Sequence, residues 1–154
     1  PQARRALQQN LHRQVEESVK LGAKIALGGV LPSGKGYFFP APVLTDVKKG
    51  CHAYDEEVFG PVAAIITAND EQEAINIAND TKFGLGAALF TKDIEKAEYI
   101  AKNIIQSGTC CVNDFVKSDP RLPFGGTKAS GYGRELSEFG IYEFVNIKTI
   151  SISE

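Results

Sequence analysis

Methionine and tryptophan are absent from this chain of 154 residues, and cysteine occurs only three times. Without an initiator methionine, the chain begins either after removal of that residue or inside a longer polypeptide. The cysteines, Cys51, Cys110 and Cys111, are odd in number, and an adjacent pair is poorly arranged for an ordinary bridge, so a disulfide scaffold is not expected. This scarcity favours a reducing compartment.

Long apolar runs and charge of one sign are also scarce. No stretch approaches the ~20 residues of a membrane span, and residues 1–5 lack the apolar core of a signal peptide. The net charge is only -2, without a long run of like charges, which argues against nucleic acid and acidic membranes as partners. A soluble, cytoplasmic protein is therefore expected.

Regular patterns are present and predict the secondary structure. The composition, 43% hydrophobic and 23% charged, is sufficient for one domain with a substantial core. Residues 3–21 are predicted to form an amphipathic helix, because apolar residues recur at every fourth position before Gly22. Short strands are expected at residues 23–27 and 43–47.

The middle of the chain alternates between strands and helices. Apolar runs predict strands at 61–68, 84–90 and 109–113, the first of them covered on both faces. Helical spacing lies between these runs, and Thr91 or Asp93 can cap the second helix. This order predicts an α/β fold with a mostly parallel sheet and flanking helices.

Two later segments differ from this pattern. Residues 114–134 form a long irregular segment rich in proline and glycine, and loops of this length often carry function. Residues 144–153 alternate β-branched and polar residues, which predicts a strand exposed along one edge.

An acidic motif precedes the apolar run at 61–68 and reads Glu-Glu-Val-Phe-Gly-Pro from Glu56 to Pro61. It is typical of a solvated turn with a core aromatic residue. It also offers Glu57 as an acceptor for ribose hydroxyl groups and Phe59 as an apolar surface for a flat ring, at a strand edge where cofactors approach α/β folds.

A glycine-rich motif spans residues 123–135 and reads Pro-Phe-Gly-Gly-Thr-Lys-Ala-Ser-Gly-Tyr-Gly-Arg-Glu. It lacks the third glycine of a dinucleotide fingerprint, because Leu136 stands at that position, and it lacks the Gly-Lys-Ser/Thr ending of a P-loop. A closely packed loop that needs glycine for backbone reasons is the better local interpretation.

The other candidate groups carry weaker signals. Cys110 and Cys111 lie in an apolar strand and are expected to be buried and inert. Cys51 follows two lysines and is a candidate reactive thiol. His12 and His52 have no evident ligand partners, so no metal site is expected.

Together the two motifs closely resemble the aldehyde dehydrogenase superfamily, whose E-E-x-F-G-P-V and P-F-G-G-x-K-x-S-G-x-G-R-E segments occur in the same order. The resemblance covers essentially the whole chain. It implies that residues 1–143 are the latter part of the catalytic domain and that residues 144–154 are a strand of the oligomerisation sheet, through which a homo-oligomer would form.

The resemblance also implies a mechanism that this chain cannot complete. In the family, a cysteine thiolate attacks the aldehyde, hydride passes to a nicotinamide cofactor, and a glutamate base assists thioester hydrolysis. The nucleophile, the base and most of the dinucleotide-binding domain precede the segment seen here. The parent is expected to be an NAD- or NADP-dependent enzyme, and the chain alone is expected to be inactive with an incomplete cofactor site.

By motif position, Glu57 resembles the residue that holds the nicotinamide ribose, with Phe59 packed beside it. Glu135 resembles a second carboxylate behind the general base, where it supports a proton relay. Phe124 and the loop before it would line the substrate tunnel.

The loop before Phe124 resembles that of bacterial succinate-semialdehyde dehydrogenases in its S-D-P-R-L-P-F form. This similarity implies a semialdehyde substrate, with Ser118 donating a hydrogen bond to its distal carboxylate. Arg121 either attracts that carboxylate or braces the loop through Asp119. Two alternatives stay open: a free-standing, non-catalytic oligomerisation or nucleotide-binding module, and thiol redox chemistry at Cys51.

Overall fold

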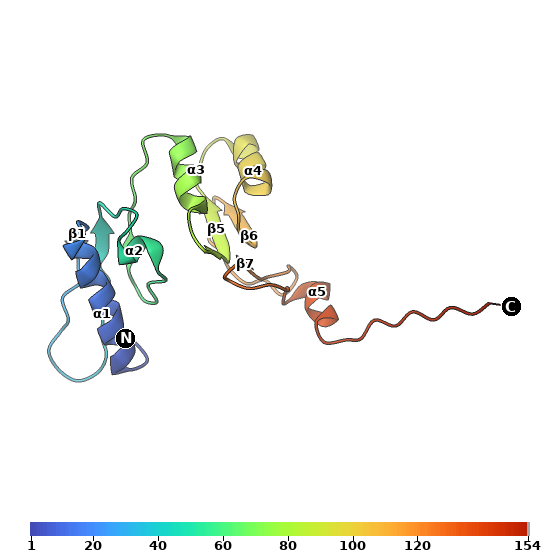
Figure 1. The fold of residues 1–154 in the computed structure, drawn as a ribbon, viewed down its shortest axis with the longest axis horizontal. Coiled ribbons are helices and arrows are strands. Elements are labelled where there is room, and N and C mark those ends of the chain that lie inside the picture. Colours follow the sequence, from blue (N-terminus) through green and yellow to red (C-terminus); the bar gives the residue numbers. More distant parts are fainter. Residues whose placement is uncertain (154) are drawn as a thin grey trace. The chain divides into compact units, whose positions relative to one another are not determined.

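The computed structural model describes residues 1–153, and its contacts divide them into two compact units (Figure 1). The first unit runs from Pro1 to Asp70, and the second begins at Glu71. Each unit is described by itself. The architecture is mixed α/β, as the alternation of sequence patterns predicts.

Helix α1 (Arg5–Lys20) supplies one side of the first core. Its predicted apolar stripe is buried in the middle, where Leu11 and Val15 are each only 1% exposed, whereas Val19 near the helix end is 37% exposed. The helix ends before Gly22, whose φ of 107° is a conformation that other residues rarely adopt. The core cluster also contains Phe39, Leu44, Val47 and Cys51.

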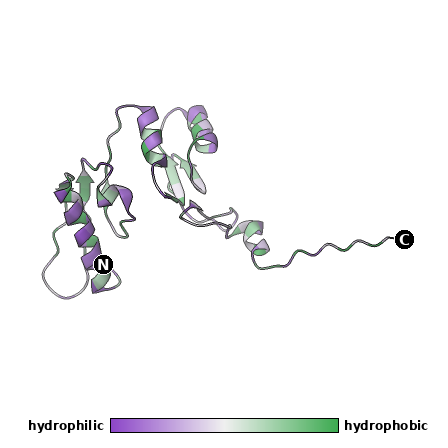
Figure 2. Cartoon of the chain, viewed as in Figure 1, coloured by the Kyte–Doolittle hydropathy of each residue, from purple (hydrophilic) through white to green (hydrophobic). Residues whose placement is uncertain are grey.

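Three short strands form the sheet of the first unit. Strand β1 (Lys24–Leu27) pairs antiparallel with β2 (Val43–Thr45), and β2 pairs parallel with β3 (Ala63–Ala64). The short helix α2 (His52–Asp55) packs against α1. In Figure 2 the sheet is coloured as hydrophobic and much of α1 as hydrophilic, as expected for a helix with one buried face.

One prediction for this unit is wrong. The apolar run at 61–68 is expected to be covered on both faces, yet both residues of β3 are exposed and Ile65 is 49% exposed. Strand β3 lies at the edge of this sheet, with β2 as its one neighbouring strand among the described residues. An apolar run alone therefore predicts the strand but not what covers it.

The second unit begins with helix α3 (Glu71–Asn79), followed by β4 (Phe83–Gly84) and β5 (Gly86–Leu89). Helix α4 (Ile94–Asn103) then leads to β6 (Thr109–Val112). Strands β5 and β6 pair parallel, and α4 packs on β6, so the predicted strand-helix-strand unit is confirmed here.

The side chain of Asp93 caps α4 by accepting a hydrogen bond of 3.0 Å from the backbone N–H of Lys96, which is the second of the two caps considered. On α3, Ile75 is buried, whereas Ala74 and Ala78 are exposed.

The expectation of a mostly parallel sheet is not confirmed. Parallel pairs (β2–β3 and β5–β6) are balanced by antiparallel ones, since β1 pairs antiparallel with β2 and β4 with β7 (Thr127–Lys128). Strand β7 lies inside the segment expected to be an irregular loop. Helix α5 (Ser137–Tyr142) follows it and is not predicted from the sequence.

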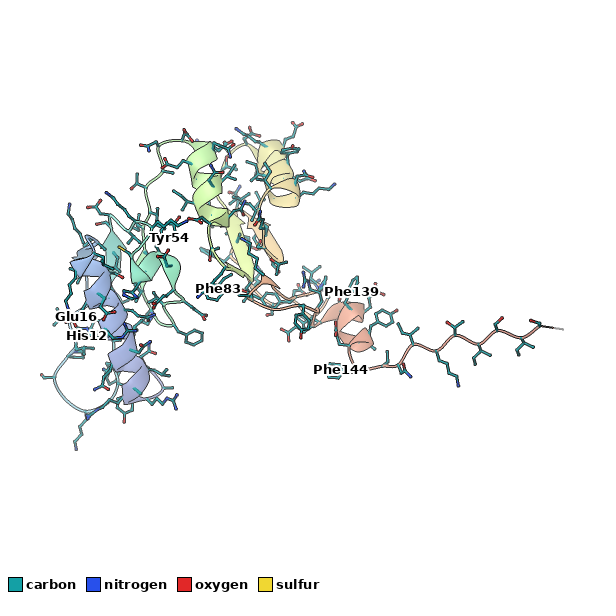
Figure 3. All side chains as sticks on the ribbon, in the orientation of Figure 1. His12, Glu16, Tyr54, Phe83, Phe139 and Phe144 are labelled. Atoms are coloured by element: carbon teal, nitrogen blue, oxygen red, sulfur yellow. The ribbon has the colours of Figure 1, made fainter. Side chains whose placement is uncertain are left out.

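The predicted strand at 144–153 is extended but unpaired among the residues that the structure describes. Phe144 is 92% exposed, and Ile150 is 74% exposed. Figure 3 shows side chains beyond Phe144 projecting to alternate sides of the extended chain. A strand requires a hydrogen-bonding partner, and no other segment of residues 1–153 supplies one here.

Candidate functional site

The acidic motif forms a turn directly after α2. Glu56 is the C-cap of that helix and has extended backbone angles, and the turn closes through the N–H of Gly60, which donates to Val58 O at 2.9 Å. Glu57 and Phe59 are both exposed, Phe59 at 73%. The turn therefore presents a carboxylate and an aromatic ring to the surroundings.

Glycine is required at position 60 because α1 approaches the turn closely. A Cβ atom there would overlap the side chain of Leu11, which is itself buried in the core. The glycine of this motif thus serves packing between the turn and α1.

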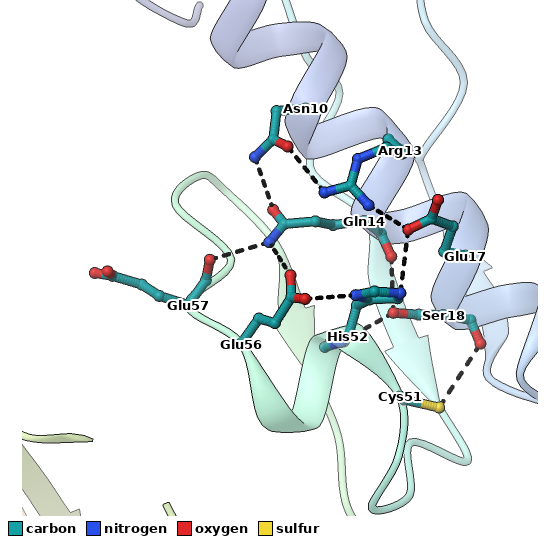
Figure 4. A network of polar contacts seen from close by, with 10 residues as sticks. Asn10, Arg13, Gln14, Glu17, Ser18, Cys51, His52, Glu56 and Glu57 are labelled. Carbon is teal, nitrogen blue, oxygen red and sulfur yellow. Dashed lines mark hydrogen bonds and ion pairs between the residues drawn. The ribbon is translucent and has the colours of Figure 1, made fainter. Parts of the chain in front are cut away.

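A polar network joins the same turn to α1 (Figure 4). The Gln14 amide group donates to Glu56 Oε2 at 2.9 Å and to the backbone carbonyl of Glu57 at 3.2 Å. His52 lies between two carboxylates, with Nδ1 2.8 Å from Glu56 Oε1 and Nε2 3.1 Å from Glu17 Oε2. Arg13 pairs with Glu17 on the helix surface.

This network determines the surroundings of the two adjacent acidic residues. Hydrogen bonds from Gln14, and then from His52, lower the pKa of Glu56 below its ordinary value. Figure 4 shows the Glu57 side chain pointing away from the network, while its backbone carbonyl faces Gln14. Glu56 is engaged within the protein, and the carboxylate of Glu57 is directed outward.

The glycine-rich motif is tied together by hydrogen bonds to backbone atoms. Phe124 and Glu135 pair as an antiparallel bridge, with N–H to O distances of 2.9 and 2.8 Å. The Arg134 guanidinium group donates to the carbonyl of Gly126 at 2.9 Å. The hydroxyl of Ser130 accepts from the N–H of Gly84 at 3.0 Å.

Lys128 of this motif binds the end of α3. Its ammonium group donates to the carbonyl oxygens of Asn79 at 2.8 Å and Thr81 at 3.0 Å. A Cβ atom at Gly108 would overlap the carbonyl of Gly125, so the start of β6 also touches this loop. These contacts support the interpretation of a closely packed loop over that of a phosphate cradle.

Phe124 and Glu135 line the same hollow of about 350 Å³ in the second unit. Phe124 is half-buried, and Glu135 is exposed. Tyr132 and Phe144 contribute further aromatic surface to this hollow. The structure therefore places an apolar ring and a carboxylate side by side.

The loop before Phe124 contains two internal ion pairs. Arg121 binds Asp119 through two contacts, Nε to Oδ1 at 2.9 Å and Nη2 to Oδ2 at 2.6 Å, so the bracing contact considered for Arg121 is formed. This pair holds the pKa of Asp119 below its usual range. Lys117 binds Asp114 at 2.8 Å, and Ser118 is exposed between the two pairs.

The cysteines are placed differently from expectation. Cys51, the candidate reactive thiol, is only 2% exposed, and its thiol lies 3.8 Å from the carbonyl oxygens of Ser18 and Leu21, so its burial argues against reactivity. Cys110 and Cys111 are half-buried rather than buried, and burial raises the pKa of the Cys110 thiol.

The site residues expected from the sequence therefore fall into two groups. Glu57 and Phe59 belong to the first unit, and the others, Ser118, Arg121, Phe124 and Glu135, belong to the second. Within residues 1–153, no three His, Cys, Asp or Glu side chains are grouped to hold a metal ion. None of the helices in that range has the length and apolarity to cross a membrane.

Known proteins with similar sequences include two succinate semialdehyde dehydrogenases. The succinate semialdehyde dehydrogenase Sad of Escherichia coli K12, whose name includes NAD(P)+, is 45% identical over 150 residues, covering 97% of this chain and 32% of the relative. The NADP+ succinate-semialdehyde dehydrogenase 1 of Mycobacterium ulcerans is 46% identical over 151 residues, covering 97% and 32%.

The solved structure of a succinic semialdehyde dehydrogenase also resembles the structure of this chain. The succinic semialdehyde dehydrogenase of Streptococcus pyogenes, in complex with NADP+, matches with a TM-score of 0.94 and 36% identity, covering all of this chain and 34% of that one. The chain thus spans about a third of the length of the relatives it matches. The sequence profile of the aldehyde dehydrogenase family matches residues 1–150, and the chain belongs to the aldehyde dehydrogenase family.

Proposed function

We propose that this chain is part of an NAD- or NADP-dependent dehydrogenase that oxidises succinate semialdehyde to succinate. The observation that carries the proposal is the turn at 56–60, in which the carboxylate of Glu57 is directed outward and Phe59, two residues later, is exposed. The identity of 45% to a succinate semialdehyde dehydrogenase supports the substrate.

The exposed pair suits a nicotinamide riboside. The Glu57 carboxylate is an acceptor for two ribose hydroxyl groups, and Phe59 offers an apolar face for the nicotinamide ring. When bound, the cofactor supplies the chemistry of accepting hydride from the substrate. In this chain, Glu57 and Phe59 would orient it.

The second unit would bind and process the aldehyde. Phe124 would line the substrate tunnel, and the Ser118 hydroxyl would donate a hydrogen bond to the distal carboxylate of the substrate. Arg121 would either attract that carboxylate directly or brace the loop by binding Asp119. Glu135, on the same hollow as Phe124, would support the proton relay to the general base.

The chain alone would not oxidise aldehydes, because none of its cysteines occupies the family's nucleophile motif, which precedes this segment. Cys51 is buried, and the raised pKa of Cys110 leaves little of its thiolate at neutral pH. The upstream part of the catalytic domain would supply the nucleophile, the general base and most of the cofactor site.

We also propose that two segments of the chain belong to different parts of the enzyme. Residues 1–143 would belong to the catalytic domain, where strands from the complete enzyme would extend the parallel pairs. Residues 144–154 would enter the oligomerisation sheet of a homo-oligomer, although Glu154 lies outside the described residues. The three free cysteines support a cytoplasmic location.

The proposal is tested by measuring NAD- and NADP-dependent oxidation of succinate semialdehyde by this chain and by an N-terminally extended form. Only the extended form should be active. In it, Glu57→Gln should lower kcat/KM for the cofactor about 10- to 100-fold, through loss of a charged acceptor. Glu95→Gln, on an exposed position of α4, is the control and should leave it unchanged.

Activity in the 154-residue chain would contradict the proposal that its active site is incomplete. An extended form that binds neither cofactor and oxidises no aldehyde would favour a non-catalytic module instead.

A further inference from the structure

Gln14 is an unusual residue in the core of the first unit. It is 5% exposed and is one of two buried polar residues among those the structure describes, the other being Ser18. Burying an amide group costs free energy unless its hydrogen bonds are made. The partners of Gln14 therefore indicate what its burial achieves.

Those partners lie mainly in the acidic turn. The Gln14 Nε2 group donates to Glu56 Oε2 and to the carbonyl of Glu57, at 2.9 and 3.2 Å, and its Oε1 accepts from Asn10 at 3.5 Å. The contact with the Glu57 carbonyl restrains a peptide group and leaves the side chain of Glu57 free to point outward (Figure 4).

The same face of α1 holds the turn by packing as well. Leu11 lies one helical turn before Gln14 and occupies the space that the missing side chain of Gly60 leaves. Polar and apolar contacts from one helix thus fix the turn on both sides of Phe59. A rigid helix face is a more precise support for a binding residue than a loop alone.

We propose that Gln14 is a positioning residue for the cofactor: its buried amide fixes the peptide of Glu57 so that the carboxylate meets the nicotinamide ribose. This inference rests on the proposed function. Gln14 itself does not touch the cofactor and acts through Glu57.

Gln14→Glu is the informative substitution, because it keeps the shape of the side chain and replaces the donor with a second carboxylate facing Glu56. In the extended dehydrogenase, it should raise KM for NAD or NADP about tenfold while kcat changes less than about twofold. Combined with Glu57→Gln, it should add little further loss, because both act on one contact.

Two matched variants separate positioning from general stability and charge. Ser18→Ala removes the other buried polar group of α1, whose hydroxyl donates to Gln14 O and accepts from the N–H of Ala53, so it should lower stability and leave KM unchanged. Gln9→Glu makes the same charge change at an exposed position of α1 and should have no effect.

Hydrogen exchange gives a readout that does not depend on the cofactor. In this chain, the backbone amides of Gly60 and Val62, which donate to Val58 O and Gly60 O within the turn, should exchange faster in Gln14→Glu than in the wild type, while those of β5 and β6 should not change. If Gln14→Glu does not fold, Gln14→Leu keeps similar volume without new charge and serves in the same comparison.

The inference is overturned if the turn amides exchange at the wild-type rate in Gln14→Glu. It is also overturned if Ser18→Ala raises KM as much as Gln14→Glu does. If Glu57→Gln leaves KM unchanged, the proposed cofactor role of Glu57 fails, and the exchange measurement alone decides whether Gln14 holds the turn.

Discussion

Glu56 and Glu57 are adjacent in the chain, yet their carboxylates meet different surroundings. Glu56 accepts a hydrogen bond from Gln14 and contacts His52, whereas Glu57 is exposed and directed away from that network. The difference arises from the extended backbone at the helix C-cap, which sends consecutive side chains to opposite sides. Two identical residue types therefore make different contacts, Glu56 within the protein and Glu57 toward its surroundings.

The surroundings of Glu56 predict a specific pH dependence. Its pKa in the folded protein lies below its ordinary value of 4.5, because Gln14 and then His52 stabilise the carboxylate. The stability this contributes is fully present above the unfolded pKa and is lost as pH falls through the lower folded pKa. Urea unfolding measured at a series of acidic pH values should show this loss.

Glu56→Gln should make the free energy of unfolding less dependent on pH below about 4.5, the ordinary pKa that marks the upper end of this window. Gln14→Leu, which removes the first donor, should reduce the same dependence partly. An unchanged slope in Glu56→Gln would show that this carboxylate does not contribute to acid unfolding.

The sequence motifs predict roles for Glu57 and Phe59 but do not reveal the contacts that hold their turn. Gln14 lies 42 positions before Glu56, beside an apolar stripe in which a polar residue has no local signal of burial. Its role depends on a tertiary contact that helical spacing does not encode. The burial of Cys51 is hidden from the sequence for the same reason, since neighbouring lysines do not reveal a buried side chain.

Among the elements, α4 is the helix whose N-terminus is defined best by its own sequence. Asp93→Ala removes the side chain that accepts from the N–H of Lys96 and should lower the free energy of unfolding by about 1 kcal/mol. Glu95→Ala, in the same first turn, should cost only a few tenths of a kcal/mol. Chemical denaturation measures both, and equal losses would show that Asp93 does not act as a cap.

Helices were predicted better than strands because their hydrogen bonds are local. The predicted ranges contain α1 and α4, and the cap of α4 was one of the two residues considered. The strand predictions for residues 61–68 and 144–153 were less accurate, because a strand depends on neighbours that its own sequence does not specify. Helix α5 was missed because it is short, starts from positive φ angles at its N-cap Leu136 and first residue Ser137, and contains Gly140.

For the whole molecule, the exposed end of the chain predicts self-association. The unpaired segment after α5 carries large exposed apolar side chains on a backbone with free hydrogen-bonding groups. Light scattering at increasing concentration should therefore reveal dimers or larger species. A chain that stays monomeric at high concentration would contradict the proposed oligomerisation segment.

Ile150→Lys tests this association directly. A charge in place of a side chain that is 74% exposed should weaken self-association at least about tenfold, because it would be desolvated in a paired sheet. Thr149→Lys introduces the same charge on the opposite side of the extended segment and should weaken association less.

The family of the whole chain was predictable, whereas its sheet was not. Two motifs in the right order were specific enough to identify an aldehyde dehydrogenase, and the family profile covers residues 1–150. The sheet of such a fold is assembled from strands distant in sequence. A chain spanning about a third of its relatives' length shows only the pairs whose partners it contains.

The contact between Leu11 and Gly60 has an evolutionary consequence. A side chain at position 60 would collide with Leu11, so Gly60→Ala is unfavourable while that leucine is present. Shortening Leu11 first would open the space, at the expense of a core residue that is 1% exposed. The two positions are therefore coupled, and Gly60→Ala should be tolerated better in a chain that carries a shorter side chain at position 11.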